Sequence, residues 1–280
     1  MSDFRSNYLS RLGIGSDFNP TRRGSDDLSL SRDPQSPTAV PPTSSDFTME
    51  FLSQQTQDDF RIQYLKKLSY AGVWVPQSAK PPRHQTAILF DYDDTLLPSV
   101  YLNHRPDALS KPEVKKHLET IASHAAALLE LAAKFGHVFI ITNAIHGWVF
   151  YSAEKYLPSL LPVLKKIKVI SARDSFELQY PGQYHEWKVQ AFLKVQKELN
   201  QQVITNLVSL GDSMIEHDAV HVMGAEFAEA LVKTIKFRDT PTPEELAKQL
   251  ELVLGKFEKI VLNARNLKIS LERKWTPDNK

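Results

Sequence analysis

The 280-residue chain contains no cysteine. This absence excludes disulfide bonds, thiolate catalysis and zinc sites built from thiolates, and it leaves carboxylate, histidine, lysine and hydroxyl side chains for any chemistry. The chain also has little net charge, a formal +1 at pH 7. Its composition therefore gives no indication of a nucleic-acid partner or of an anionic membrane surface.

Long apolar runs are lacking as well. No run approaches the roughly 18 apolar residues of a membrane-spanning helix, and residues 1–30 lack the apolar core of a secretory signal. We therefore expect a cytoplasmic protein without a membrane partner, with the nucleus as an alternative compartment. Hydrophobic residues nevertheless make up 42% of the chain, which is enough for a sizeable core.

The N-terminal 45 residues are rich in Ser, Pro, Arg and Asp. Such a segment cannot bury enough apolar surface to offset its loss of conformational entropy, so residues 1–45 are predicted to form a disordered tail. Apolar side chains then recur at loosely helical spacing within 56–71. This pattern predicts a helical lead-in segment over residues 46–83.

From residue 84 onward, short apolar segments alternate with segments of helical pattern. Strands are expected at 86–91, 137–142, 167–171, 206–211 and 233–237. The clearest helix spans 111–135, with Ser110 and Glu113 at capping-box spacing and Gly136 as its C-terminal stop. Continuous apolar strands that alternate with helices predict an α/β fold, a three-layer Rossmann-like architecture whose parallel sheet is covered on both faces.

Chemically active side chains follow three of these strands or begin a helix between them. In order along the chain they are Asp91, Asp93, Thr95, Thr142, Asn143, Lys188, Asp212 and Glu216. Ligands of such sheets bind outside the carboxyl ends of the strands, so we expect these side chains to converge on one edge.

Carboxylates that lie this close together repel one another unless a cation lies among them. Oxygen ligands suit Mg²⁺, which takes one or two protein carboxylates and keeps several waters for a phosphate substrate. The sequence therefore predicts a Mg²⁺ site at this edge of the sheet.

The ordered motifs resemble those of the haloacid dehalogenase superfamily, a group of aspartate-based phosphotransferases. That family has a D-x-D-x-T motif after an apolar strand, a Ser or Thr that ends the next strand, a lysine, and a later acidic motif. The matching positions are Asp91, Asp93, Thr95, Thr142, Lys188 and the segment GDSMIEHD at 211–218. The resemblance covers roughly residues 84–240, which it identifies as the catalytic domain.

This resemblance implies a Mg²⁺-dependent phosphatase that forms an aspartyl-phosphate intermediate. Asp91 would be the nucleophile. Asp93 would protonate the leaving oxygen and then activate water. Thr142 and the backbone amides after Asp91 would hold the transferring oxygens, and Lys188 would offset the charge of nucleophile and phosphate.

The same resemblance implies that Asp91, the carbonyl of Asp93 and Asp212 bind the metal. Glu216 has the spacing expected for the outer acid of the fourth motif, and Asp218 is the alternative. Thr95, Asn143 and Arg105 are expected to contact the substrate, whereas the neighbouring Asp94 is interpreted as a loop-capping carboxylate.

The spacing of the motifs leaves no room for a sizeable cap domain. About fifty residues separate Asp91 from Thr142, and the loop 98–110 is the only local candidate for a lid. An open site favours a macromolecular substrate such as a phosphoprotein, which brings its own surface to exclude water. A small phosphorylated metabolite, and a catalytically weak scaffold or binding protein, remain alternatives.

The C-terminal residues 241–280 are predicted to form a helical extension. Thr242-Pro243-Glu244-Glu245 is a capping-box start, and apolar side chains recur at helical spacing as far as Leu267. Packing against the catalytic domain is the simpler interpretation, and binding to a protein partner or a second copy is the alternative.

Overall fold

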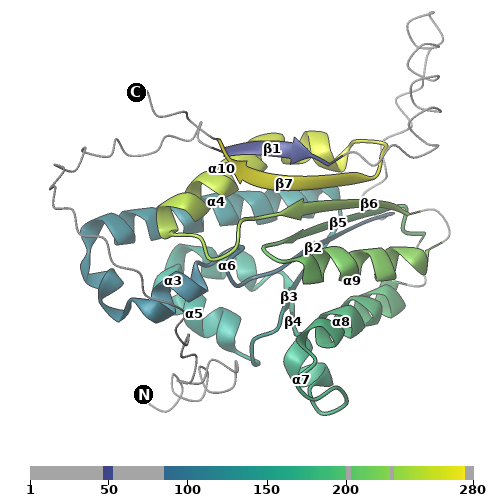
Figure 1. Ribbon diagram of the computed structural model, residues 1–280, viewed down its shortest axis with the longest axis horizontal. Helices are drawn as coiled ribbons and strands as arrows, with labels where there is room; N and C mark the ends of the chain where they lie inside the picture. The colour runs from purple at the N-terminus through teal and green to yellow at the C-terminus, as the bar shows by residue number, and fades with distance from the viewer. Residues whose placement is uncertain (1–46, 53–84, 200–202, 228–229, 275–280) are drawn as a thin grey trace, which may run out of the picture. The chain divides into compact units, whose positions relative to one another are not determined.

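The computed structural model describes residues 47–52, 85–199, 203–227 and 230–274 (Figure 1). The predicted tail at 1–45 and the helical pattern at 56–71 lie outside these residues.

Within the described residues, seven strands form one sheet in the order β1-β7-β6-β5-β2-β3-β4 (Figure 1). The five strands that the apolar segments predict are all present and pair in parallel. They are β2 (Thr86–Phe90), β3 (His137–Thr142), β4 (Lys168–Ser171), β5 (Asn206–Gly211) and β6 (Leu231–Lys236). The prediction of an α/β fold around a parallel sheet is confirmed.

Two further strands extend the sheet beyond residues 84–240. β7 (Leu267–Arg273) pairs in parallel with β6, and β1 (Phe47–Phe51) pairs antiparallel with β7. The prediction of a helical segment at 46–83 is therefore wrong for residues 47–51. The prediction of a helical extension over 241–280 is also wrong for residues 262–274, because the helix ends at Val261 and a strand follows.

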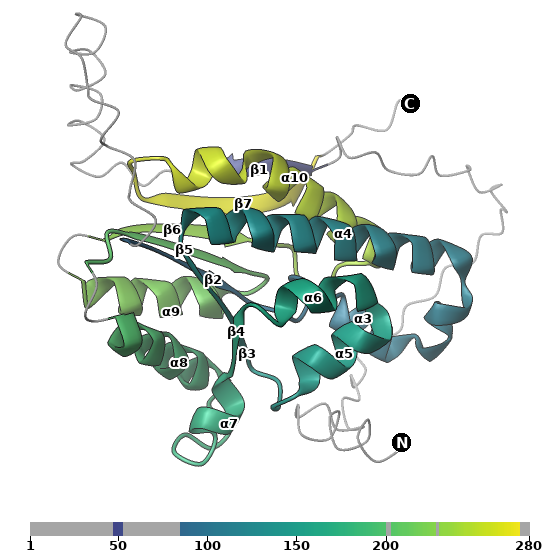
Figure 2. The same cartoon turned by 180° about the vertical axis from the view of Figure 1, so that it is seen from behind.

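Two long helices cover one face of the sheet and two others cover the opposite face. α4 (Pro112–Phe135) and α10 (Pro243–Val261) pack against each other, and they lie in front of the sheet in the reversed view (Figure 2). α8 (Tyr184–Leu199) and α9 (Met214–Ala225) lie on the other face (Figure 1). The apolar side of α10 is thus buried within the domain, as the simpler interpretation of that helix predicts.

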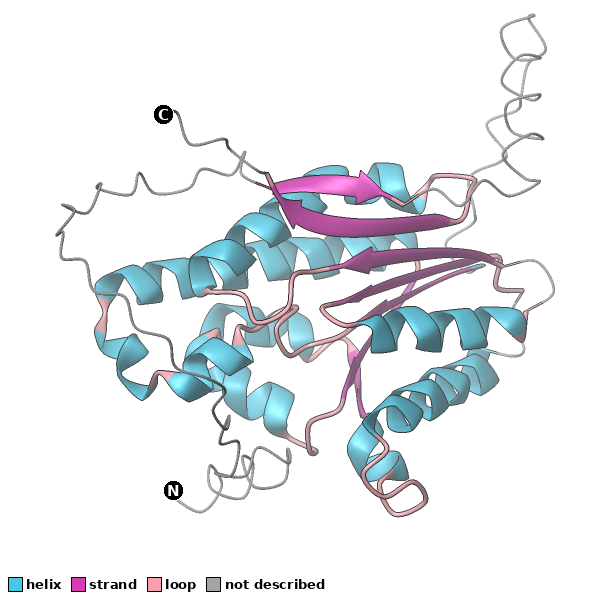
Figure 3. Ribbon diagram, viewed as in Figure 1, coloured by secondary structure: helices cyan, strands magenta, loops and turns pink. Residues whose placement is uncertain are grey.

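Shorter helices lie in the connections between the strands and the long helices, and Figure 3 shows how helices and strands alternate. They are α3 (Ser99–His104), η4 (Pro106–Ser110), α5 (Trp148–Tyr156), η5 (Pro158–Leu160), α6 (Leu161–Leu164) and α7 (Ala172–Phe176). Among all the helices described, none is long and apolar enough to cross a membrane.

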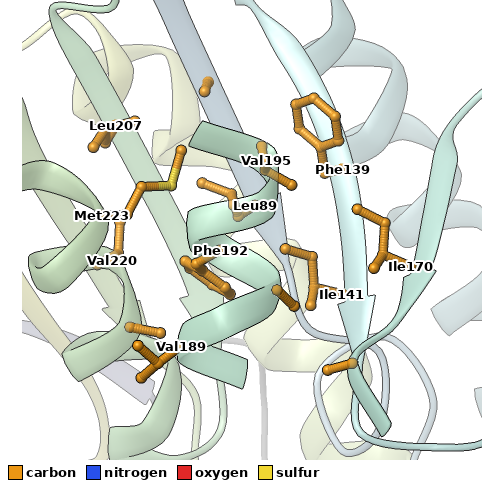
Figure 4. Packing of buried hydrophobic residues seen from close by; sticks show 14 of the residues in the cluster. Leu89, Phe139, Ile141, Ile170, Val189, Phe192, Val195, Leu207, Val220 and Met223 are labelled. Carbon is orange, nitrogen blue, oxygen red and sulfur yellow. The ribbon is translucent and has the colours of Figure 1, made fainter. Parts of the chain in front are cut away.

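The core between the sheet and α8 and α9 is built from alternate strand residues and one face of each helix (Figure 4). Its labelled members are Leu89, Phe139, Ile141, Ile170, Val189, Phe192, Val195, Leu207, Val220 and Met223. Full burial of an aliphatic or aromatic side chain stabilises a fold by about 1.5–3 kcal/mol, so this cluster fixes α8 and α9 firmly against the strands.

The starts of α4 and α10 differ in how well the sequence predicts them. The capping box of Thr242 and Glu245 is present at α10, with Pro243 in the first turn. The capping box predicted for Ser110 is wrong, because Pro112 begins α4 and Ser110 instead donates to the Asp107 carbonyl at 2.6 Å.

Gly136 ends α4, but in an extended conformation rather than a left-handed one. A Cβ atom at this position would lie 2.4 Å from the Thr86 carbonyl oxygen. The glycine therefore permits close contact between the start of β3 and β2.

Candidate active site

The candidate site lies where β3, β2 and β5 end side by side. Phe90 is in register with Ile140 on β3 and with Leu210 on β5, so the residues that follow all three strands meet at one edge. The Asp91 amide continues this pairing by donating to the Leu210 carbonyl at 2.8 Å. The parallel register thus places Asp91 centrally, with Thr142 on one side and Asp212 on the other.

A buried lysine bridges two carboxylates at this edge. Lys188, in the first turns of α8, lies with its Nζ 2.5 Å from Asp91 Oδ1 and 3.0 Å from Glu216 Oε1. The Lys188 side chain is 2% exposed, and each of the two acids is 7% exposed. The convergence of Asp91 and Lys188, which lie 97 residues apart, is found as expected.

Glu216 is occupied on both of its carboxylate oxygens. Oε1 contacts Lys188, and Oε2 accepts hydrogen bonds from the Ser213 hydroxyl at 2.6 Å and the Ser213 amide at 3.3 Å, as part of the capping box that starts α9. A Cβ atom on Gly211 would lie 2.4 Å from Glu216 Cγ, so only glycine lets this acid approach the end of β5. Glu216 therefore stabilises Lys188 and the helix start directly.

Asp218 points elsewhere. Its carboxylate is half exposed and lies 3.3 Å from both His185 Nε2 and His217 Nδ1. These two histidines lower the pKa of Asp218 despite its partial desolvation. No contact among the described residues brings Asp218 to Asp91, so Glu216 is the acid of this motif that belongs to the site.

Two carboxylates contact Lys188, and a third, that of Asp212, lies close enough to interact with all of them through its charge, so acidic groups outnumber the one cation here. Burial raises the pKa of Asp212 to about 9, and the charges of Asp91 and Glu216 add to this effect. Burial likewise raises the pKa of Asp91 to about 7, with Glu216 and Asp93 contributing and Lys188 opposing. For Lys188 itself burial disfavours the charged form, but the charges of Asp91 and Glu216 outweigh it and raise its pKa.

The donor atoms at this edge fit a hard divalent cation. The Asp212 carboxylate accepts no hydrogen bond from the described residues, and Asp91 Oδ2 has no such partner either. No three acidic or histidine side chains in the described part already surround a common point as metal ligands. Mg²⁺ requires only one or two carboxylates and completes its shell with water, so Asp91 and Asp212 suffice.

Asp93 accepts hydrogen bonds from three side chains. Its Oδ1 lies 2.5 Å from Ser99 Oγ and 2.8 Å from Trp148 Nε1, and its Oδ2 lies 2.9 Å from Thr142 Oγ1. Thr142 is therefore next to the Asp motif as expected, but it contacts Asp93. The sequence analysis missed Ser99 and Trp148, which belong to no motif and lie six and 55 residues after Asp93.

The loop after β2 is closed by its own backbone. The amides of Leu96 and Leu97 donate to the Tyr92 carbonyl at 2.8 and 3.1 Å. Asp94 has a left-handed φ of 54° and accepts the Val100 amide at 3.1 Å, which agrees with its interpretation as a loop-capping carboxylate. Burial raises the pKa of Asp94 to about 7.

Two of the residues expected to contact substrate lie near the edge but are already engaged or covered. Thr95 is fully buried, and its hydroxyl has no hydrogen-bond partner among the described residues. Asn143 follows β3 and donates from Nδ2 to the Tyr184 carbonyl at 3.2 Å, while its buried Oδ1 has no partner in the same part of the chain. Both side chains hold unused hydrogen-bonding capacity at the edge.

Arg105, like Thr95 and Asn143, makes no side-chain contact with Asp91 or Asp93 among the described residues. It lies exposed at the end of α3, with its guanidinium 4.7 Å from the centre of the Tyr101 ring. Tyr101 and Arg105 thus form a pair on and just after α3, the helix that Ser99 begins.

Comparisons of the chain with protein-family models, with curated proteins and with solved structures give no match. The inference of function therefore depends on the residues of this edge and on their geometry.

Proposed function

We propose that the protein is a Mg²⁺-dependent phosphatase of the haloacid dehalogenase type. The observation that carries this proposal is the buried group of Asp91, Lys188 and Glu216 at the carboxyl edge of a parallel sheet, with Asp93 two residues away. Phosphoryl transfer through a covalent intermediate requires a nucleophile and a cation that stabilises the developing charge, and a carboxylate beside a buried lysine supplies both. The second acid next to them can transfer the proton.

In the first step, Asp91 Oδ2 attacks the phosphorus while the bond from phosphorus to the leaving oxygen breaks. Lys188 on Oδ1 orients the carboxylate and offsets charge. Asp93 gives its proton to the leaving oxygen as this bond breaks.

In the second step, Asp93 accepts a proton from water, and the resulting hydroxide attacks the phosphorus. The bond between phosphorus and Asp91 breaks, which releases inorganic phosphate and restores the carboxylate. This division into two displacements replaces one difficult step with two easier ones.

Asp91, Asp212 and the carbonyl of Asp93 would hold Mg²⁺. The cation would supply neutralisation of the phosphate charge and of the excess negative charge of the three acids.

A macromolecular substrate, such as a phosphoprotein, is the preferred class. Between Asp91 and Thr142 the chain forms α3, η4 and α4, and α4 packs against α10, so few residues are left to cover the site. A large substrate supplies the surface that excludes water from an uncovered site. Small phosphorylated metabolites are the second class, and a scaffold without activity is the remaining possibility.

The direct test is hydrolysis of p-nitrophenyl phosphate, with and without Mg²⁺, by the parent protein, Asp91→Asn and a control variant. Glu258→Gln removes an exposed carboxylate on α10 and should leave the rate unchanged. Activity that requires both Mg²⁺ and Asp91 supports the proposal. Folded protein that neither hydrolyses the ester nor binds Mg²⁺ by calorimetry would refute it and favour the scaffold.

Panels of phosphopeptides and of phosphorylated metabolites then separate the two substrate classes. A kcat/KM that is higher by an order of magnitude or more for phosphopeptides supports a macromolecular substrate. The reverse preference would assign the enzyme to small metabolites.

A further inference from the structure

The two oxygens of the Asp93 carboxylate are held in different ways. Oδ1 accepts two hydrogen bonds, from Ser99 Oγ at 2.5 Å and from Trp148 Nε1 at 2.8 Å. Oδ2 accepts one, from Thr142 Oγ1 at 2.9 Å. The donors come from the starts of α3 and α5 and from the end of β3, so three separate elements meet at one carboxylate.

The donors on Oδ1 are fixed by the surrounding structure. Ser99 is 3% exposed and Trp148 is 5% exposed. The first turn of α5 is held in turn by Ser152, whose hydroxyl donates to the Trp148 carbonyl at 2.7 Å and lies 3.0 Å from the buried Tyr92 hydroxyl. A ring held in this way keeps its N–H directed at Oδ1.

Thr142, the donor to Oδ2, is also expected to donate to the substrate. Thr142 is the residue expected to hold a transferring phosphate oxygen, and a threonine hydroxyl carries only one hydrogen. This hydroxyl already accepts a hydrogen bond from the Ala144 amide at 2.9 Å, and its single hydrogen can be donated to Asp93 or to a phosphate, but not to both. If that hydrogen turns to a phosphate, Oδ2 loses its donor while Oδ1 keeps both of its own.

The two donors on Oδ1 favour Oδ2 as the oxygen of Asp93 that carries a proton. An indole nitrogen donates a hydrogen bond and cannot accept one, so a proton on Oδ1 cannot point at Trp148. It would have to point at Ser99, whose hydroxyl would then turn from donor to acceptor. A proton on Oδ2 leaves both hydrogen bonds to Oδ1 as they are.

We propose that Trp148, assisted by Ser99, is a positioning residue that anchors Oδ1 of Asp93 and makes Oδ2 the oxygen that carries the proton in catalysis. The inference rests on the proposed phosphatase function. When phosphate takes the hydrogen of Thr142, the proton on Oδ2 passes to the leaving oxygen as its bond to phosphorus breaks. In the second step, the same Oδ2 receives the proton of the attacking water.

Loss of this anchor should affect substrates according to their leaving groups. Phenol is a poorer leaving group than p-nitrophenol and depends more strongly on protonation in the transition state. A misplaced acid therefore slows phenyl phosphate more than p-nitrophenyl phosphate, whereas a general loss of folded protein slows both equally.

Trp148→Phe tests the inference because it removes the N–H and keeps an aromatic ring. Trp187→Phe is the matched control, since Trp187 is also buried and donates its indole N–H, at 2.5 Å, to the backbone carbonyl of Tyr180. Both variants lose an indole N–H bond, but only Trp148→Phe alters Asp93. Thermal unfolding of each variant shows what fraction is folded at the assay temperature.

We expect Trp148→Phe to lower the ratio of kcat for phenyl phosphate to kcat for p-nitrophenyl phosphate by about tenfold, with little change in KM, because general acid catalysis contributes about 10²–10⁴-fold. Ser99→Ala should lower the same ratio to a smaller extent, and it serves as the test if Trp148→Phe does not fold. Trp187→Phe should leave the ratio unchanged.

An unchanged ratio in folded Trp148→Phe and Ser99→Ala, measured against an active parent, would overturn the inference and leave the phosphatase proposal intact. An equal fall in Trp187→Phe would also overturn it, because the effect would then be structural. A parent protein without activity on either ester would instead refute the proposed function and the inference with it.

Discussion

Lys233 is a buried lysine outside the candidate site, and its surroundings predict an unusual dependence of stability on pH. It lies on β6 with no exposed surface, and its Nζ donates to Asn206 Oδ1 at 2.7 Å and to the Val261 carbonyl at 2.6 Å. No carboxylate pairs with it among the described residues. Burial lowers the pKa of Lys233 to about 7, and a neutral amine satisfies both acceptors with its two hydrogens.

The sign of the effect follows from proton binding. The folded-state pKa of Lys233 is lower than that of the unfolded chain, about 10.4, so between these values the unfolded state binds more protons. Lys233 therefore increases the free energy of unfolding as pH rises from about 7 to about 10, which means that the folded state becomes more stable. Each pKa unit corresponds to about 1.4 kcal/mol, and the rise between pH 7 and pH 9 amounts to about 2 kcal/mol.

The assay is urea unfolding of the parent and of Lys233→Met at both pH values. The substitution leaves Asn206 and the Val261 carbonyl without their donor, but this loss is the same at each pH. Other titrating groups, such as Asp212 with its pKa of about 9, act equally on both proteins and cancel in the difference. The stability of the parent relative to the variant should therefore improve by about 2 kcal/mol between pH 7 and pH 9. A difference that stays constant with pH would refute a neutral buried Lys233.

Three further predictions concern Lys188, Asp212 and a pair of glycines, one next to the site and one on α10. Lys188→Met should destabilise the fold by about 3–5 kcal/mol in urea unfolding, because it leaves two buried acids without their cation, and a loss below about 1 kcal/mol would contradict this. Asp212→Asn should weaken Mg²⁺ binding in calorimetry by about tenfold or more, since it removes a ligand, whereas Asp218→Asn should not; equal losses would place the metal elsewhere. Gly211→Ala should cost about 1–3 kcal/mol through its clash with Glu216, whereas Gly255→Ala, with open space around it, should stabilise α10 by up to about 1 kcal/mol in thermal unfolding. The reverse order for the two glycines would refute the packing described.

The central strands could be predicted because their apolar runs are continuous and bounded by turns. β7 was missed although LKISLER alternates polar and apolar residues as a half-buried strand does, because Leu267 also continues the helical spacing of α10. Pairing with β6 and β1 decides between the two patterns. For the start of α4, Pro112 overrides the capping pattern of Ser110, since the residue before a proline favours an extended conformation, as Lys111 shows.

At the site, strand order alone predicts that the residues after β2, β3 and β5 meet. The positions of Ser99 and Trp148 could not be predicted, because they depend on how two loops fold over the same edge. Glu216 shows a different limit. The spacing of Ser213 and Glu216 is a visible capping box, and the structure shows that the same side chain both caps α9 and contacts Lys188.

The pairing of β1 with β7 joins residues more than two hundred positions apart, Phe47 opposite Arg273. During synthesis β1 is made before every other described strand and β7 after all of them, so β1 has no partner until the rest of the sheet has been translated. Until then β6 is the edge of the sheet, with unpaired backbone groups on one side. Completion of this edge is therefore a late event in folding. Loss of β7 would also remove the strand with which β1 pairs.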